Sequence, residues 1–422
     1  MKQILHYLSF WLLLFLAIYF FIYIFPFPLD WLPFQIGKGI SELISEFWQW
    51  LVLFVAEDLI GYSESIATRN NGSGDGTYHF FKVVVQAILA IVLSIIWLLL
   101  DKKMVFYNKI RSFITVYVRY YLGFTLLSYG LAKVFPNQFW EPQLTDLLKP
   151  FGDISPMGLL WKFMGYSVSY IIFTGILEVL AGALLFFRNT AKLGALIAFG
   201  ILLNIFVLNM SYDVPVKLYS FHLLILSILI LIPYLRGLVN FFILNRSADS
   251  YKSKPYFNKT LHNRFGYFIK GILILFIAST MISNNYENQW KFGRKAPLPI
   301  LYGIYEVESF VKNNDTVPPI VSHNTRWKRL VIDRYNANVT KMNDEVFYVG
   351  KEIDTVNEYI ELKSFKDASN YRFKYHLKNQ TLVLTGTKDY DSLEITFKVR
   401  NKSDFYLMKR GFHWINEFPN NR

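Results

Sequence analysis

The sequence predicts an α-helical membrane bundle of about seven transmembrane helices, followed by a C-terminal all-β domain. Of its 422 residues, 53% are hydrophobic and 18% are aromatic, and the mean hydropathy is +0.27, which is unusual for a soluble domain. Runs of about 20 apolar residues, long enough to cross a bilayer, recur along the first two thirds of the chain. From about Asn284 the pattern changes to short alternating segments, which is typical of antiparallel strands.

Seven apolar runs are predicted to span the membrane. The first is too long for the apolar part of a signal peptide and is followed by "FPFPLDWLPF", which contains no small-residue cleavage site, so we expect a retained anchor. The predicted spans are residues 3–26, 80–100, 112–134, 166–187, 192–210, 217–235 and 266–283.

The net charge of +13 is concentrated in alternate loops. Lys and Arg gather in residues 101–111, 188–192 and 235–264, whereas residues 27–79 are acidic. Cytoplasmic loops carry the excess of Lys and Arg, so this distribution indicates membrane topology and gives no reason to expect nucleic acid as a partner. We expect a bacterial inner-membrane protein with a cytoplasmic N-terminus and a periplasmic C-terminal domain.

Between the first two spans lies a segment with apolar residues at helical spacing. We expect a helix on the outer membrane surface, since its tryptophans suit the interface. Its apolar positions are Ile36, Ile40, Leu43, Ile44, Phe47, Trp48 and Leu51. Asp75 follows in a Gly-rich stretch, which offers too few carboxylates for calcium and is better explained as a turn.

The absence of cysteine excludes disulfides, thiolate metal sites and cysteine-ligated iron–sulfur clusters. No P-loop, flavin motif or pair of haem ligands is recognisable, and no metal site is predicted.

Eight alternating segments predict an antiparallel meander, closed as a barrel. They are residues 301–311, 326–335, 345–350, 358–364, 371–377, 381–387, 393–399 and 405–410. In "GIYEVESF" the alternation places Gly303, Tyr305, Val307 and Ser309 on one face, and this segment resembles the first strand of lipocalin-like barrels.

Two ionisable residues are expected deep in the membrane, where charges are costly and usually paired. Counted at 1.5 Å per residue from Arg111 and Arg188, Arg119 and Glu178 lie at similar depth on successive helices. We therefore predict an Arg119–Glu178 ion pair. It could be a functional site or a salt bridge that only fixes the packing.

A second polar group is expected near the outer ends of the spans, where it could form an outward-facing pocket. A quinone carbonyl could accept a hydrogen bond from a Lys or His there, and His titrates near neutral pH. The alternative is capping and snorkelling at the interface. The candidates are Tyr129, Lys133, Asn209, Asp213, Lys217 and His222.

Two stretches, "VRYYLGFTLLSYGLAKVF" and "GILEVLAGALLFFRNTAKLGALIAFG", carry a family resemblance. Through them, residues 112–236 resemble the DoxX-like family of four-helix membrane proteins, and the whole arrangement looks like the longer DoxX-like proteins of Bacteroidetes. The residues that carry the resemblance are Arg119, Gly130, Lys133, Glu178, Gly182 and Arg188.

The resemblance implies a component of a quinone-linked electron-transfer system, because the family includes small subunits of a terminal quinol oxidase and of thiosulfate:quinone oxidoreductase. It implies a quinone as the cofactor and a redox protein as the partner. The alternative is a non-enzymatic envelope protein whose β domain binds a lipid, a peptide or a partner protein. The expected division is residues 1–111, 112–236 (DoxX-like core), 237–265 (basic cytoplasmic loop), 266–283 (seventh helix) and 284–422 (β domain).

Overall fold

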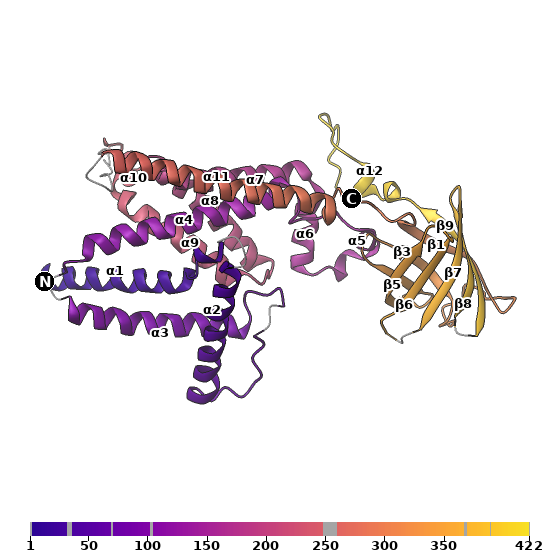
Figure 1. Ribbon diagram of the computed structural model, residues 1–422. Coiled ribbons are helices and arrows are strands. Elements are labelled where there is room, and N and C mark those ends of the chain that lie inside the picture. Colours follow the sequence, from indigo (N-terminus) through magenta and orange to yellow (C-terminus); the bar gives the residue numbers. More distant parts are fainter. Residues whose placement is uncertain are drawn as a thin grey trace. The chain divides into compact units, whose positions relative to one another are not determined.

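The computed structural model describes residues 2–31, 36–68, 71–101, 104–247, 260–366, 369–388 and 390–421. It confirms the predicted fold class, a helical bundle and a C-terminal β domain (Figure 1). The chain forms two compact units: Met1–Phe139 with Pro156–Gln289, and Trp140–Ser155 with Trp290–Arg422. The boundaries therefore differ from the prediction at residues 140–155, which were expected in the four-helix core and belong to the barrel unit, and at residues 284–289, which were expected in the β domain and belong to the helical unit. Most of the basic loop, residues 248–259, lies outside the described residues.

Every predicted span forms a helix. The long helices are α1 (Lys2–Ile24), α2 (Ile36–Leu53), α3 (Thr77–Leu100), α4 (Tyr107–Val134), α7 (Val168–Leu185), α8 (Ala191–Ser211), α9 (Lys217–Leu231) and α11 (Thr260–Lys291). The short ones in the same unit are η1 (Leu29–Trp31), η2 (Phe54–Leu59), α6 (Pro156–Tyr166), η4 (Ile232–Tyr234) and α10 (Leu235–Phe242).

Within the described residues, seven helical segments are long and apolar enough to cross a membrane. They include Gly37–Leu59, which was expected on the surface, and they do not include α4, whose tyrosines and charged residues lower its hydropathy. Figure 1 draws α2 across the direction of α1 and α3. Its apolar side chains Leu43, Phe47 and Trp50 are exposed, which suits contact with lipid.

The other seven long helices alternate in direction (Figure 1). The ring contacts Phe10–Tyr107 and Phe27–Phe124 show that α1 and α4 run parallel. In contrast, α4 and α7 are antiparallel, because Gly130 meets Gly175 and Gly123 meets Gly182. This alternation places the start of α1 and the described parts of the basic loops at one end of the bundle.

The seam between α4 and α7 depends on these four glycines. A Cβ atom on Gly130 would lie 2.8 Å from the carbonyl oxygen of Gly175, and one on Gly175 would lie 2.7 Å from the carbonyl oxygen of Gly130. Small residues that let two backbones approach this closely are typical of helix contacts in membranes.

The C-terminal unit contains a closed antiparallel barrel of eight strands in chain order, in which β1 also pairs with β9. Its up-and-down topology is lipocalin-like. The strands are β1 (Gly303–Lys312), β3 (Trp327–Ile332), β4 (Ala337–Lys341), β5 (Val346–Asp354), β6 (Tyr359–Ser364), β7 (Asn370–Lys378), β8 (Thr381–Lys388) and β9 (Asp391–Arg400), and the two-residue β2 (Asp315–Thr316) pairs with the end of β1.

Seven of the eight predicted strands are confirmed, and one is wrong. Residues 405–410 contain the short helix α12 (Tyr406–Lys409), after η5 (Lys402–Asp404). Because β9 already pairs with β1, the sheet has no free edge there for a further strand. The missed strand is β4, whose first four residues are all buried, so it shows no alternation.

The first strand also departs from simple alternation. A β-bulge between Val307 and Ser309 shifts the register against β9. Tyr305 faces the barrel core, but Ser309, which was predicted on the same face as Tyr305, does not follow it, because beyond the bulge Phe310, 1% exposed, is the inward residue.

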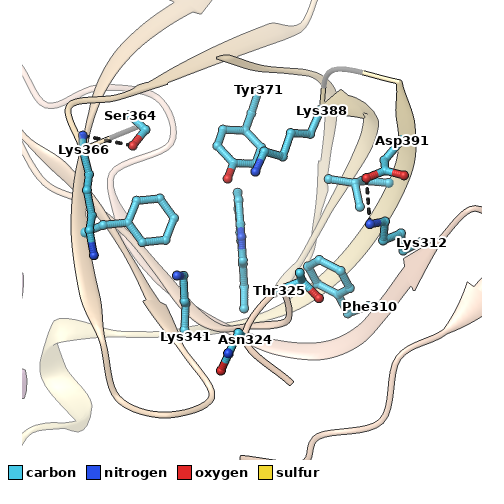
Figure 2. Close-up of a pocket in the computed structure, with 13 residues that line it drawn as sticks. Phe310, Lys312, Asn324, Thr325, Lys341, Ser364, Lys366, Tyr371, Lys388 and Asp391 are labelled. Carbon is cyan, nitrogen blue, oxygen red and sulfur yellow. Dashed lines mark hydrogen bonds and ion pairs between the residues drawn. The ribbon is translucent and has the colours of Figure 1, made fainter. Parts of the chain in front are cut away.

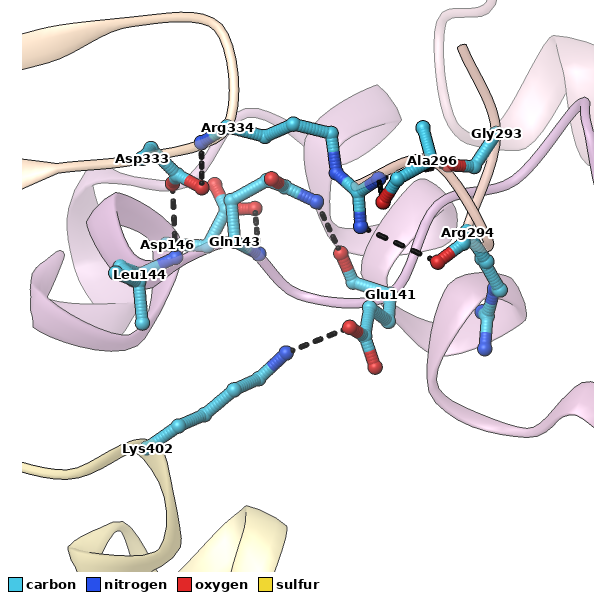
Figure 3. A network of polar contacts seen from close by, with 10 residues as sticks. All are labelled: Glu141, Gln143, Leu144, Asp146, Gly293, Arg294, Ala296, Asp333, Arg334 and Lys402. Carbon is cyan, nitrogen blue, oxygen red and sulfur yellow. Dashed lines mark hydrogen bonds and ion pairs between the residues drawn. The ribbon is translucent and has the colours of Figure 1, made fainter. Parts of the chain in front are cut away.

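A polar network explains why residues 140–155 belong with the barrel (Figure 3). This loop carries α5 (Leu144–Leu148) and η3 (Phe151–Asp153). The Asp333 carboxylate accepts hydrogen bonds from the backbone N–H groups of Leu144, at 3.0 Å, and Arg334, at 2.9 Å. Lys402 pairs with Glu141 at 2.9 Å, and Leu144 packs on Ile304 and Val331.

Candidate functional site

The helical unit contains a cavity of about 460 Å³ between α4, α6, α7, α8 and α9. Its volume lies in the range of small-molecule sites. Most of its wall is leucine, isoleucine, valine and aromatic side chains. The polar residues that line it are Thr125, Tyr129, Lys133, Gln138, Tyr170, Thr174, Glu178, Asn204, Asn209, Tyr219 and Ser220.

Lys133 and Glu178 form a buried ion pair at this cavity. The Lys133 Nζ lies 2.9 Å from Oε1 and 2.7 Å from Oε2 of Glu178, and the two residues are 6% and 2% exposed. Each stands three residues after the glycine that makes the close contact, Gly130 in α4 and Gly175 in α7. Because helical side chains lean toward the N-terminus of their own helix, on antiparallel helices these two lean toward each other.

The predicted Arg119–Glu178 pair is therefore wrong. The prediction took Arg111 and Arg188 to be at the same level, but the contact of Gly123 with Gly182 places Arg188 level with Tyr117. Arg119 is then about 12 Å along the helix axis from the level of Glu178. Its guanidinium lies 5.5 Å from the ring centroid of Tyr120, and its buried Nε has no hydrogen-bond partner among the residues that the structure describes.

Two further predicted residues, Tyr129 and Asn209, line the cavity beside the ion pair. Asn209 is 7% exposed, and it lines the cavity on α8. Sequence reasoning missed Glu178 as a cavity residue, together with Asn204, Gln138 and Tyr219. The spacing of Glu178 from Gly175 and Gly182 was a usable signal.

Asp213 and Lys217 do not reach the cavity. They form an exposed ion pair at 2.7 Å at the start of α9. Lys217 is also 3.8 Å from Asp75, whose carboxylate accepts the backbone N–H groups of Lys217, at 2.8 Å, and Leu218, at 2.9 Å. Asp75 thus caps α9 from a distant loop, a role that the interpretation as a simple turn did not include.

His222 is buried on the opposite side of α9, against α1. Its Nε2 lies 2.6 Å from the Tyr19 hydroxyl, and its Nδ1 lies 2.7 Å from the Leu218 carbonyl oxygen. Its ring stacks on Tyr23 at 4.2 Å between centroids, with planes 6° apart. The predicted pocket of six residues is therefore divided: Tyr129, Lys133 and Asn209 share the cavity, and Asp213, Lys217 and His222 do not.

The donors at the cavity are an ammonium, three side-chain amides and hydroxyl groups, which suit a ligand with carbonyl oxygens and an apolar ring or tail. In the described ranges, no three His, Asp or Glu side chains gather as a metal site would require.

Comparison with known proteins gives one informative similarity. No family model matches the sequence, and no solved structure matches it. The chain is 35% identical over 124 residues to the uncharacterized protein YwoB of Bacillus subtilis (strain 168). The aligned region covers 29% of this chain and 79% of YwoB. At this identity and coverage, the chain belongs to the same family as YwoB.

Proposed function

We propose that this protein is a bacterial inner-membrane component of a quinone-linked electron-transfer system, and that the bundle cavity binds the quinone head group. The proposed orientation has a cytoplasmic N-terminus and a periplasmic barrel. The basic loops support this orientation, because their described parts lie at the end of the bundle where α1 begins.

The observation that carries the proposal is the donor set of the cavity. A quinone head group is a flat apolar ring with carbonyl oxygens on opposite sides. Lys133 and the Asn209 amide are two separate donors on α4 and α8, and the leucine, isoleucine and aromatic walls suit the ring. The residues present therefore fit the group.

The cavity also has exposed aromatic residues that suit entry from the lipid. Tyr129, Tyr170 and Phe173 line it and are 43%, 43% and 56% exposed on the bundle. An isoprenoid quinone resides in the hydrocarbon phase of the membrane. A lateral entrance bordered by aromatic rings would admit its head group while the tail remained in the lipid.

A bound quinone would supply a two-electron, two-proton carrier. Near it, the Glu178 carboxylate could hold or release a proton, and its hydrogen bonds with Lys133 would keep it oriented. Electrons would come from a redox partner protein, since the sequence has no cysteine and no recognisable flavin or haem motif.

The test is mass spectrometry of small molecules that co-purify with the protein in native lipid discs. We expect menaquinone or ubiquinone enriched well above the surrounding lipid. The quinone should be lost in Asn209→Leu and in the double variant Lys133→Met with Glu178→Leu, which removes the pair without leaving a buried charge. His222→Gln is the matched control, because this polar residue faces α1 and should not affect the quinone. No enrichment, or equal loss in the control, would reject the proposal.

A second candidate, a non-enzymatic envelope protein whose barrel unit binds a partner, is favoured by the C-terminal segment. The barrel core is filled by side chains, whereas Phe412, Trp414 and Phe418 are 77%, 91% and 83% exposed. Exposed aromatic groups of this kind mark contact sites for proteins or membranes. A photo-crosslinker at position 414 in living cells distinguishes the two candidates. A defined protein adduct would support the partner-binding envelope protein, and lipid adducts alone would count against it.

A further inference from the structure

One end of the barrel contains a pocket of about 200 Å³ (Figure 2). At this end β1, β4, β6 and β8 finish, and β3, β5, β7 and β9 begin. The side chains that line it thus come from all eight strands of the barrel and from the segment just before β3. The pocket is separate from the bundle cavity and shares no residue with it.

The rim of this pocket is positively charged. Lys312, Lys341, Lys366 and Lys388 line it, and Asp391 is the one acidic residue among the lining side chains. Asp391 pairs with Lys312 at 2.7 Å. Glu345, just outside, is shared between Lys366 and Lys341. Four ammonium groups therefore face two carboxylates, which leaves about two positive charges at the rim.

Lys388 contributes to this excess of positive charge at the rim. Its Nζ lies 5.2 Å from the ring centroid of Tyr371 and, among the described residues, forms no ion pair within 4 Å. In Figure 2 its side chain extends toward Tyr371 and the interior of the pocket. An ammonium held over a ring in this way is positioned for an anion that enters the pocket.

The floor of the pocket is apolar and rigid. Phe310, Trp327 and Tyr371 are 1%, 2% and 5% exposed, and the Trp327 ring packs against both of the others, with its centroid 6.4 Å from that of Phe310 and 5.3 Å from that of Tyr371. A fully hydrated anion gains nothing from such a floor. A ligand with an apolar body would bury that body on the rings while its charged end remained among the lysines.

We propose that this end of the barrel binds a small amphipathic anion, a carboxylate on an aromatic or short apolar body. The pocket volume limits the ligand to small molecules, and the excess of about two positive charges suits one carboxylate better than a cluster of phosphates. This site goes beyond the proposed function, because it does not depend on whether the bundle cavity holds a quinone.

The test uses the full-length protein in lipid discs, with 2-naphthoate as the probe and its neutral analogue 2-naphthamide as the comparison. Equilibrium dialysis against empty discs corrects for partition into lipid. We expect saturable binding of 2-naphthoate and binding of the amide that is weaker by about tenfold, the factor that corresponds to 1.4 kcal/mol. Equal binding of acid and amide would overturn the proposal, as would a stronger response to inorganic phosphate.

Paired lysine variants locate the site. Lys366→Gln with Lys388→Gln removes two charges from the rim and should weaken 2-naphthoate binding by about tenfold. Lys374→Gln with Lys398→Gln removes two charges from exposed positions on the outer face of β7 and β9 and should change it less than about twofold. If both pairs weaken binding equally, the effect is general electrostatics and the assigned site is wrong. These are surface substitutions, so the folded barrel should persist.

Discussion

The seam between α4 and α7 and the interior of the barrel are both tightly packed, but they are built from different residues. In the seam, glycine backbones touch and the ion pair Lys133–Glu178 is buried beside them. In the barrel, large rings such as Trp327 and Phe373 fill the centre, and ion pairs such as Glu306–Arg329 are partly exposed.

The difference follows from the solvent that each region faces. Apolar side chains gain little by leaving lipid, so helices in a membrane are held by close backbone contact and by polar groups that have no alternative partner. The barrel has a water-facing surface, and burial of its rings supplies the main driving force. Equivalent substitutions in the two regions should therefore have unequal effects.

The largest expected effect comes from breaking the buried ion pair. Glu178→Leu would leave Lys133 charged and unpaired in an apolar interior, and we expect a loss of about 3–5 kcal/mol in the free energy of unfolding. Glu306→Leu breaks a partly exposed pair in the barrel and should cost below about 1 kcal/mol. Unfolding of the two variants in detergent, followed by circular dichroism, measures both. Adding Lys133→Met to Glu178→Leu should recover most of the lost free energy of unfolding. Equal costs in bundle and barrel would contradict the comparison.

The glycine seam gives the second effect. In Gly175→Ala the added methyl would lie 2.7 Å from the Gly130 carbonyl oxygen, so α4 and α7 must separate, at a cost of about 2 kcal/mol. Gly200→Ala in α8 is the control, since a methyl there meets no atom within 4 Å. It should stabilise the protein by up to about 1 kcal/mol through helix propensity. Thermal unfolding of both variants should shift in opposite directions, and a shift in the same direction would reject the role of the seam.

A smaller effect is expected at the cap of α9. Asp75→Ala removes an acceptor from the N–H groups of Lys217 and Leu218 and should cost about 1 kcal/mol. Asp213→Ala removes the exposed partner of the same lysine and should cost below about 0.5 kcal/mol. Hydrogen exchange of the first turn of α9 reports the cap directly. Faster exchange only in Asp213→Ala would show that Asp75 has no capping role.

The smallest effect concerns pH and the barrel rim. Hydrogen bonds from Lys366 and Lys341 lower the pKa of the Glu345 carboxyl to about 2. The pKa of Glu345 is lower in the folded barrel than in the unfolded chain. The interaction of its carboxylate with the two lysines therefore stabilises the barrel above about pH 4.5, and this stabilisation is lost as the pH falls toward 2. The difference in Tm between the natural protein and Glu345→Gln should therefore shrink from pH 6 to pH 2. A difference that stays constant would mean that Glu345 acts through packing.

The hydrophobic pattern alone was sufficient to find the seven alternating helices and seven of the eight barrel strands. Each of these elements has one strongly apolar face or is apolar all round, so its period is visible without a partner. The pattern failed where alternation of apolar and polar residues does not correspond to a strand with one buried face. The strand β4 is buried on both faces, and the segment 405–410 alternates but has no sheet edge to join.

The sequence by itself determined which residues are polar within the membrane segments, and it named Lys133, Glu178, Tyr129 and Asn209 among them. Only the tertiary structure decided which of them meet. The partner of Glu178 depends on the stagger of α4 against α7, which is set by where glycine backbones can touch. The direction of His222 depends on how α9 is rotated between α1 and the cavity. Stagger and rotation are properties of the packed pair, because a helix turns through 100° at each residue and a small shift replaces one partner with another.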